Sequence, residues 1–475
     1  MIEAMAQTFF FYDLETSGLS AREDRVMQFA GQRTDMDLNP IGESYNLLVA
    51  LGDDTLPSPD ALMVTGISPQ KTLDEGYTEA QFAKILQEEI FTEDTIAVGF
   101  NSVRFDDEFV RHLFWRNFYD PYSWTWRDGR SRWDLLDVVR MTRALRPDGI
   151  EWPVDSEGKA TNRLELITKA NGVVHDNAHD ALADVIALIE VAKLIKSKQP
   201  QLFDYLLSIR DKKSVAKLVN LDSKQPFVYV SGRYDSEWNK ATIAFPLTSA
   251  PNGNVVVYDL RYDPSDFVKL NDKELAAKIF ATWEERQAED FVKLPTKVLQ
   301  YNRCPAVAPL GVLSASDGWQ RIGLDEATIQ KHMKILLAHP EFAERLRGIY
   351  ERKKDYPAAV DPEAQLYDGF LADRDALRVE AVRNASENEL ADFHPDFADE
   401  RLAPLLLHYK ARSFPRTLTE PEVATWEERR AARIHRQLPG FMKSLERIAK
   451  TADDNQQFML EELKLWLESV MPTDD

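Results

Sequence analysis

The stretch that decides the fold lies at residues 8–16 and reads Thr-Phe-Phe-Phe-Tyr-Asp-Leu-Glu-Thr. Its aromatic first half predicts a buried β-strand over Thr8–Tyr12, and two carboxylates follow directly. Successive side chains of a strand point to opposite faces, so Asp13 and Glu15 share one face while Leu14 points into the core. Such a pair is by default a solvated strand end, and it gains meaning only with partners elsewhere in the chain.

Two further motifs supply such partners. Residues 101–108 read NSVRFDDE, and residues 179–185 read HDALADV. Each has an ordinary explanation as well: Asp106 favourably faces the positive end of a helix dipole, and His179 belongs to a helix cap that precedes Asp184. The order of the three motifs carries more information than any one of them.

Together the motifs offer what hydrolysis of a phosphodiester requires. Carboxylate oxygens are hard ligands that suit Mg²⁺, and two ions about 3.5–4 Å apart can activate water and stabilise the leaving oxygen. Histidine titrates near neutral pH, so His179 is predicted as the general base. The predicted catalytic set is Asp13, Glu15, Asp106, His179 and Asp184. Its four carboxylates form the predicted site for two Mg²⁺ ions, with Mn²⁺ as a substitute.

The first region of the chain, residues 1–198, has the pattern of an α/β domain. Thr78 and Gln81 form a capping box ahead of an amphipathic helix. The other elements predicted here are strands at residues 25–33 and 95–100 and a strongly periodic helix over residues 180–197.

The sequence pattern changes twice further on. Residues 199–354 contain short β-rich runs and turn signals such as Asn252-Gly253, which predict a small barrel or sandwich interrupted by helices. The expected strands lie at residues 227–231, 241–245 and 254–260, and the expected helices at 272–287 and 325–337. Residues 355–475 are rich in charged residues at helical spacing and predict a third, all-α domain.

The three acidic motifs, in this order, resemble those of the DEDD exonucleases of the histidine-base subclass, which share an RNase-H-like α/β fold. The resemblance implies that Asp13 bridges both metal ions and that Glu15 and Asp184 complete the catalytic one. It implies that Asp106 supports the second ion through water. Glu15 and Thr16 are also expected to contact the terminal nucleotide.

Nearly the whole chain resembles the bacterial exonuclease I family. Besides the acidic motifs, the resemblance rests on FYDPYSW at 118–124, SRWDLLDVVR at 131–140, ALRPDGIEWP at 144–153, AQLYDGF at 364–370 and ARSFPRTL at 411–418. The family implies an SH3-like middle domain and a helical last domain. It also implies processive 3′→5′ hydrolysis of single-stranded DNA to 5′-mononucleotides, in DNA repair and recombination.

A cluster of aromatic and arginine side chains lies between the second and third motifs. Aromatic rings stack on any base and cations bind phosphates, which suits sequence-independent binding of a single strand. Over half of these large aromatics are nevertheless expected to be core residues. The predicted substrate-binding residues beyond Glu15 and Thr16 are Arg111, Tyr122, Trp126 and Arg140 in this cluster, and Arg163, Lys212 and Tyr367 elsewhere.

The resemblance also implies a protein partner, because exonuclease I docks the acidic C-terminal tail of single-stranded-DNA-binding protein. A basic pocket with an apolar floor suits such a tail. The positions matched to this site are Arg146 and Tyr205. The sequence departs from the family pattern at Ser314 and Leu337, where arginines are expected.

Composition limits the compartment and the partners. The 475 residues carry a formal charge of −21, which argues against non-specific duplex binding but not against a local groove, because carboxylates that hold metal ions do not repel DNA. The single cysteine, Cys304, excludes an internal disulfide and favours a reducing compartment. No signal peptide and no apolar run of about 18 residues are found. We expect a cytoplasmic, monomeric protein without membrane contact.

Two alternatives stay open at this level. The same carboxylates work on either sugar, so a 3′→5′ exoribonuclease is the nearest alternative. The other is a non-catalytic single-strand-binding scaffold that retains an inert nuclease fold. Comparison of matched DNA and RNA strands decides the first alternative. Tight strand binding without release of mononucleotides, in Mg²⁺ and in Mn²⁺, would favour the second.

Overall fold

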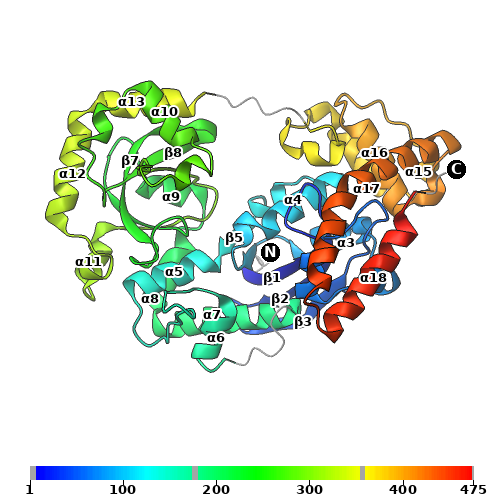
Figure 1. The fold of residues 1–475 in the computed structure, drawn as a ribbon, viewed down its shortest axis with the longest axis horizontal. Helices are drawn as coiled ribbons and strands as arrows, with labels where there is room; N and C mark the ends of the chain where they lie inside the picture. The colour runs from blue at the N-terminus through cyan, green and yellow to red at the C-terminus, as the bar shows by residue number, and fades with distance from the viewer. Residues whose placement is uncertain (1–6, 174–179, 353–358, 473–475) are drawn as a thin grey trace, which may run out of the picture. The chain divides into compact units, whose positions relative to one another are not determined.

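The computed structural model describes residues 7–173, 180–352 and 359–472, which form two compact units (Figure 1). The first unit combines residues 7–131, 180–189 and 359–472, and the second combines residues 132–173 and 190–352. The chain leaves the first unit at strand β5 (Ser131–Asp134) and again within helix α7 (Ala181–Lys198).

Four strands form the centre of the first unit in the order β3-β2-β1-β4. They are β1 (Thr8–Thr16), β2 (Val26–Thr34), β3 (Pro40–Leu48) and β4 (Thr95–Gly99). Strand β1 pairs antiparallel with β2, with Tyr12 opposite Gly31, and parallel with β4, with Phe9 opposite Ile96. The predicted strands at 8–12, 25–33 and 95–100 are therefore confirmed, and the first extends to Thr16.

The aromatic run of β1 is buried on both faces of the sheet. Phe9, Phe10, Phe11 and Tyr12 are all inaccessible to solvent or nearly so. The ring of Phe10 lies so close to Gly31 that a Cβ there would come within 2.3 Å of it. Close packing of this kind fixes the strand rigidly up to the point where its carboxylates begin.

Short helices surround this sheet. They are α1 (Pro59–Thr65), α2 (Pro69–Glu75), α3 (Glu79–Ile85) and α4 (Asp106–Arg116). The capping box expected at Thr78 and Gln81 is present at the start of α3, with each side chain bonded to the other's backbone N–H. Phe82 and Phe109, from α3 and α4, enter the core beside Phe29 of β2.

The C-terminal part of the first unit is helical, as predicted. Its helices are α14 (Ala376–Asn384), α15 (Glu387–Ala391), α16 (Leu402–Ser413), α17 (Glu420–Ala449) and α18 (Asp454–Val470). Figure 1 shows α17 and α18, in orange and red, beside the blue N-terminal strands. Ile434 and Phe441 of α17 and Leu463 of α18 share one apolar cluster with Met27 and Leu62. The last quarter of the chain therefore completes the core begun by its N-terminal part.

The second unit contains a five-stranded antiparallel sheet in the order β10-β6-β7-β8-β9. Its strands are β6 (Phe227–Val230), β7 (Ala241–Ala250), β8 (Asn254–Asp259), β9 (Thr296–Leu299) and β10 (Ala306–Pro309). The turn expected at Asn252-Gly253 joins β7 to β8, and both residues have the left-handed φ that Asn and Gly tolerate best. Phe227, Val257 and Val307 lie in the core of this sheet.

Helices of the second unit precede, interrupt and follow the sheet. They are α5 (Leu135–Leu145), α6 (Leu164–Ala170), α8 (Pro200–Ser208), α9 (Lys212–Leu218), α10 (Asp272–Phe280), α11 (Gly318–Arg321), α12 (Glu326–Ala338) and α13 (Pro340–Tyr350). The helix expected at 272–287 ends earlier, at Phe280, and the one expected at 325–337 is α12. Among the described residues, none of the helices has the length and apolar character needed to cross a membrane.

Candidate active site

The first two carboxylates of the site lie at the end of β1. Asp13 and Glu15 are half-buried, whereas Leu14 between them is 4% exposed and packs in the core, as the alternation of a strand requires. A register shift between Glu15 and Thr16 ends the regular pairing with β2 directly after the second carboxylate. Irregularities of this kind commonly redirect a strand next to a functional site.

The third carboxylate lies in the first turn of α7. Asp180 precedes this helix, and its Oδ1 accepts hydrogen bonds from the backbone N–H of Leu182 (3.0 Å) and Ala183 (3.3 Å). This cap sets the start of the helix, so Asp184 follows one turn later. Carboxylate oxygens of Asp13, Glu15 and Asp184 all lie within 4.8 Å of one another. Side chains far apart in the sequence thus meet at one point.

The fourth predicted carboxylate, Asp106, is the first residue of α4 and is 4% exposed. Its negative charge is one of the main influences that raise the pKa of Asp13, so it lies within electrostatic reach of that carboxylate. The adjacent Asp107 has a different role, because the hydroxyl of Tyr12 donates a 2.7 Å hydrogen bond to its Oδ1 inside the core. Of the two neighbouring acids, therefore, Asp106 belongs to the cluster and Asp107 to the packing of β1.

The electrostatics of this cluster are those of an uncompensated acidic site. Burial raises the pKa of Asp13 well above its usual range, and the charges of Asp106, Glu15 and Asp184 raise it further. The pKa of Glu15 is likewise raised to about 8, by burial first and then by the charges of Asp184 and Asp180. No arginine or lysine is among the main influences on either group. Divalent cations would remove this repulsion, and hard oxygen donors at this spacing fit them.

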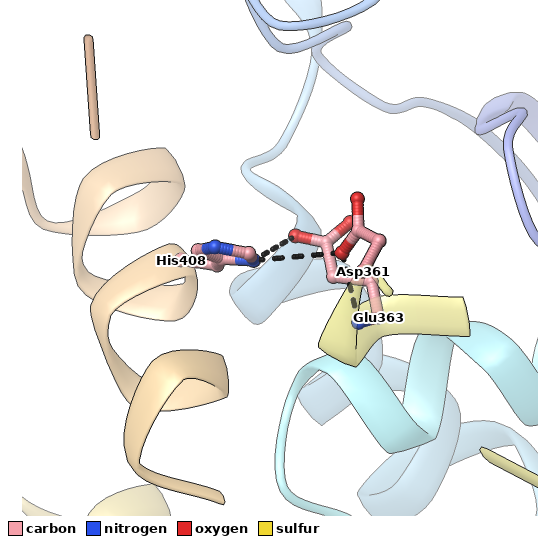
Figure 2. A group of neighbouring side chains, drawn as sticks. All are labelled: Asp361, Glu363 and His408. Carbon is pink, nitrogen blue, oxygen red and sulfur yellow. Dashed lines mark hydrogen bonds and ion pairs between the residues drawn. The ribbon is translucent and has the colours of Figure 1, made fainter. Parts of the chain in front are cut away.

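A second acidic cluster in the same unit has similar geometry and a different environment. Oxygens of Asp361 and Glu363 and a ring nitrogen of His408 lie within 4.8 Å of one another (Figure 2). His408 points from α16 toward the two carboxylates, which lie at the start of the 3₁₀ segment η8 (Pro362–Tyr367). Its Nδ1 is 3.1 Å from Glu363 Oε1.

Arginines neutralise this second cluster. Glu363 pairs with Arg25 at 2.5 Å and with Arg412, while Asp361 pairs with Arg429 at 2.9 Å. Although burial alone would raise the pKa of Glu363, the guanidinium groups of Arg412, Arg429 and Arg25 hold it well below its usual range.

Asp54 lies in the same network. It pairs with Arg429 at 2.7 Å and with the buried Arg433 at 3.6 Å. Burial opposes ionisation, but Arg433, Arg25 and Arg429 lower the pKa of Asp54 far below its usual value. We name the set Asp54, Asp361, Glu363, His408, Arg25, Arg412, Arg429 and Arg433 the arginine network. Its charges are balanced by protein side chains, so it lacks the electrostatic character of a metal centre.

The substrate-binding candidates of the first unit differ in exposure. Trp126 is 62% exposed and accessible for stacking. Tyr122 is half-buried under the guanidinium of Arg111, 5.8 Å from its ring centre, and Arg111 itself pairs with Glu108 at 2.9 Å. Tyr367 donates a hydrogen bond to the other oxygen of Glu108.

Thr16 is buried, and its hydroxyl donates to the backbone carbonyl of Gly18 at 2.7 Å. It therefore shapes the turn after β1. Over half of the aromatic cluster was expected in the core, and this is confirmed: Trp115, Phe118, Trp124 and Trp133 are buried.

The substrate-binding candidates of the second unit are charged side chains in a helix or at its start. Arg140 of α5 pairs with Asp137 at 2.7 Å and lies against Gly232. Arg163 caps α6 and forms an exposed ion pair with Glu165. Lys212 is the exposed first residue of α9.

The two partner-binding candidates contact the same segment of the second unit. Arg146 donates to the carbonyl of Val312 at 2.8 Å, and Tyr205 donates to the carbonyl of Val307 at 3.1 Å. Burial raises the pKa of Tyr205 to about 12.

His179, the predicted base, lies outside the described residues. Sequence reasoning also missed two features of the first unit. One is the arginine network. The other is a groove beside α4 that is lined in part by Leu19, Arg22 and Arg104. Arg104 lies inside the second motif and Leu19 follows the first motif by three residues, so their closeness in sequence to the acidic residues was the available signal.

Family models match three consecutive parts of the chain. The Exonuclease model matches residues 10–192, the Exonuclease I SH3-like domain matches residues 210–352, and the Exonuclease I C-terminal domain matches residues 360–470. The architecture expected from the sequence is thereby confirmed. The boundaries expected after residues 198 and 354 stay a prediction.

Curated relatives are similar along nearly the whole chain. Exodeoxyribonuclease I of Haemophilus influenzae is 37% identical over 452 residues, which cover 95% of each chain. Exodeoxyribonuclease I of Escherichia coli is 38% identical over 457 residues, covering 95% of this chain and 96% of the relative.

Solved structures are similar in fold as well. Escherichia coli Exonuclease I in complex with a dA16 oligonucleotide superposes with a TM-score of 0.94 at 36% identity. The zinc-bound form of the Escherichia coli enzyme with single-stranded DNA gives 0.93 at 36%, and SSB/Exonuclease I with the inhibitor CFAM gives 0.89 at 35%. Each match covers 98% of this chain and 100% of the other.

Proposed function

This chain belongs to the exonuclease I family, and on that premise we propose that it hydrolyses single-stranded DNA processively from the 3′ end and releases 5′-mononucleotides. One observation carries the proposal: carboxylate oxygens of Asp13, Glu15 and Asp184 converge within 4.8 Å, and Asp106 acts electrostatically on Asp13. The relatives support the substrate class, since they are exodeoxyribonucleases and one is seen with a dA16 oligonucleotide.

We propose two Mg²⁺ ions as the cofactor, with Mn²⁺ as a substitute. The donor set supports this choice, because every predicted ligand is a carboxylate and the cluster lacks a protein cation among its main influences. When bound, such ions supply a nucleophilic water and stabilise charge on the phosphoryl and leaving oxygens. Asp13 interacts electrostatically with all three other carboxylates, which supports it as the ligand shared by both ions.

The remaining residues hold the substrate and move a proton. Glu15 and Thr16, at the end of β1, are proposed to contact the terminal nucleotide. His179 is proposed as the base that accepts a proton from the attacking water, since an imidazole titrates near neutral pH. Arg111, Tyr122, Trp126 and Tyr367 of the first unit, and Arg140, Arg163 and Lys212 of the second, are proposed to bind the strand.

A labelled oligonucleotide tests this function. With a 5′-labelled single strand and Mg²⁺, we expect a ladder of products that shortens from the 3′ end. The ladder should disappear in excess EDTA and in Asp106→Ala, while Asp74→Asn, at an exposed acid of α2, behaves as wild type. Full activity in EDTA or in Asp106→Ala would overturn the proposal. Faster cleavage of a matched RNA strand would favour the exoribonuclease, and binding without product in both Mg²⁺ and Mn²⁺ would favour the scaffold.

We further propose that the acidic tail of single-stranded-DNA-binding protein docks at Arg146 and Tyr205. One similar solved structure is of SSB/Exonuclease I. In the second unit both side chains hydrogen-bond to the segment Val307–Val312, which places them along one strip of backbone. An acidic tail peptide should bind wild type and lose most of its affinity in Arg146→Ala, measured by fluorescence anisotropy. Unchanged affinity would remove the site.

Because the matched relatives are bacterial and act on DNA, we propose a cytoplasmic location. We also propose that the protein acts as a monomer, which a sedimentation equilibrium measurement would test.

A further inference from the structure

A buried hydrogen bond links the two elements on which Asp13 and Asp106 lie. Tyr12 is in β1 directly before Asp13, and Asp107 is in α4 directly after Asp106. The Tyr12 hydroxyl donates to Asp107 Oδ1 at 2.7 Å, across 95 positions of the sequence. Tyr12 and Asp107 are each only 1% exposed. The bond therefore joins strand to helix one residue away from a candidate metal ligand on either side.

The ring of Tyr12 is held from two directions. It stacks on Phe29 of β2 with ring centres 6.2 Å apart, and it meets Phe91 edge-on at 6.0 Å. Phe29 and Phe91 are themselves inaccessible to solvent. Close packing of this kind restricts the orientation of the ring and therefore the place of its hydroxyl. A group that accepts a hydrogen bond from this hydroxyl is consequently fixed relative to β1.

The sheet does not by itself fix α4 beside the carboxylates. In the described part of the chain, the parallel pairing of β1 with β4 covers residues 8–11 and ends with Phe11 opposite Val98. From Asp13 onward β1 pairs with β2, on its other side. Because α4 follows β4 in the chain, its position relative to Asp13 depends on contacts made beyond the ladder.

The turn between β4 and α4 is tight and begins close to Tyr12. A Cβ on Gly99, the last residue of β4, would lie 2.4 Å from the Cβ of Ser102 and 3.4 Å from the carbonyl oxygen of Tyr12. Asn101 has a left-handed φ of 66°, which asparagine adopts more readily than most residues. This turn directs the chain from β4 into α4, and the hydrogen bond from Tyr12 then ties the helix to β1.

The two acids at the start of α4 face different neighbours. Successive residues of an α-helix are rotated by about 100° around its axis. Asp107 faces the buried hydroxyl of Tyr12, whereas Asp106 acts electrostatically on Asp13. A rotation or shift of the helix that breaks the first contact would therefore also move Asp106 relative to Asp13.

We propose that Tyr12 and Asp107 form a positioning pair for the metal site. Their hydrogen bond fixes the first turn of α4 against the end of β1 and so sets the separation between Asp106 and Asp13. In this role the pair touches neither metal nor substrate and acts through those two carboxylates. The proposal rests on the function proposed above and deepens it, since it identifies what holds the strand half and the helix half of the carboxylate set together.

Removal of the tyrosine hydroxyl tests the pair in the working enzyme. Tyr12→Phe should lower kcat about tenfold, because residues that orient metal ligands typically contribute about 10–100-fold to activity or metal affinity. KM for a dT12 strand should stay within about twofold, since no contact with the strand is lost. The matched control is Tyr301→Phe, which loses a 2.9 Å hydrogen bond from its hydroxyl to the carbonyl of Val219 in the second unit. This control should keep the wild-type kcat.

Substitutions of Asp107 separate positioning from metal binding. Asp107→Asn keeps an Oδ1 that can accept the hydroxyl of Tyr12, so its kcat should stay within about threefold of wild type. Asp107→Ala removes the acceptor and should lose as much as Tyr12→Phe, and the double variant should lose no more than either single variant. A loss in Asp107→Asn as large as that in Asp106→Ala would overturn the proposal, because Asp107 would then act as a metal ligand.

Two measurements without DNA report on the site itself. In EDTA, hydrogen exchange of the backbone amides of residues 105–112 should be faster in Tyr12→Phe than in wild type and unchanged in Tyr301→Phe. Binding of Mn²⁺, followed by electron paramagnetic resonance, should be about tenfold weaker for at least one ion in Tyr12→Phe. Exchange and Mn²⁺ affinity equal to those of wild type would overturn the proposal even if kcat falls.

The outcomes distinguish the positioning pair from the function on which it rests. If wild type degrades single-stranded DNA and Tyr12→Phe matches Tyr301→Phe in kcat, exchange and Mn²⁺ binding, the pair fails and the function stands. If wild type releases no nucleotide while Tyr12→Phe exchanges faster and binds Mn²⁺ more weakly, the function fails and the pair stands.

Discussion

Two acidic clusters of the first unit invite direct comparison. In each, ligand atoms of three side chains of types that can bind metal lie within 4.8 Å of one another, namely Asp13, Glu15 and Asp184 in one and Asp361, Glu363 and His408 in the other. Distance alone therefore does not separate them. The direction of the pKa shift does, because burial and like charges raise it for Asp13 and Glu15 while arginines lower it for Glu363.

The difference shows how the same residue type serves two purposes. The first cluster is electrostatically incomplete in the protein alone and is completed by cations from solution. The arginine network is complete within the chain and joins β2, the loop at residue 54, η8, α16 and α17. One cluster should therefore control activity and the other stability, and four predictions test this division.

Removal of one metal-binding charge should have the largest effect. Asp184→Asn is expected to lower the rate of DNA hydrolysis by about a thousandfold, since lost metal stabilisation amounts to several kcal/mol at about 1.4 kcal/mol per factor of ten. The metal-free variant should be at least as stable as wild type, because a like charge is gone. Initial rates and urea midpoints in EDTA measure both, with Asp74→Asn as control. A large loss of stability would contradict the division.

Removal of one charge from the arginine network should produce the reverse pattern. Glu363→Gln leaves Arg25 and Arg412 without their buried counter-charge, which is expected to lower the free energy of unfolding by about 3–5 kcal/mol. The remaining folded protein should bind Mn²⁺ as wild type does. Denaturant unfolding and metal titration test this against Glu428→Gln, at an exposed glutamate of α17. Unchanged stability would break the comparison.

The two clusters should also respond oppositely to pH. Without metal, Glu15 has a pKa of about 8 in the folded protein and about 4.5 when unfolded, so the folded state holds an extra proton and stability falls as the pH rises between these values. Asp54 and Glu363 have lowered pKa values, so their contribution is present above about pH 4.5 and is lost as the pH falls.

Unfolding in EDTA across pH 3–9 measures both limbs of this profile. Because Asp13 contributes to the neutral limb and Asp54 to the acid limb, Glu15→Gln should weaken the neutral limb only and Glu363→Gln should weaken the acid limb only. A neutral limb that is unchanged in Glu15→Gln would show that other groups cause it.

The smallest expected effect concerns His408. Burial lowers its pKa, so it acts as a neutral hydrogen-bond partner of Glu363. His408→Gln should cost about 1 kcal/mol of stability, the usual net value of one hydrogen bond. Its number of bound Zn²⁺ or Mn²⁺ ions should equal that of wild type in isothermal titration. Loss of one metal site in this variant would mean that the second cluster binds metal after all.

Local patterns predicted the strands and helices that carry the site. The aromatic run before Asp13 and the periodic helix that carries Asp184 were both predicted from the sequence. That their carboxylates meet was implied by the resemblance of the ordered motifs to a known family, and by no local pattern. Strand β3 was missed because it is exposed along most of its length and lacks alternation of apolar residues. Ile186 of the periodic helix α7 is half exposed, so helical periodicity alone does not decide which apolar positions are buried.

The electrostatic character of the two clusters could not be predicted from the sequence, because it depends on contacts between residues that are far apart in the chain. Arg429 and Arg433 look like ordinary surface charges of a polar helix, yet Arg433 is 2% exposed and pairs with Asp54, which lies far away in the sequence. No spacing rule connects residues separated by several hundred positions. The pKa of Glu15 likewise depends on burial and on charges brought in by α7.

The arginine network has a consequence for how the polypeptide is made. Arg25 and Asp54 leave the ribosome early, whereas Arg412, Arg429 and Arg433 emerge only after the entire second unit has been translated. Until the last helices are made, Asp54 therefore has only Arg25 as a partner from this network, and the partners on α17 are still absent. A nuclease organised in this way acquires its full rigidity only when translation is nearly finished.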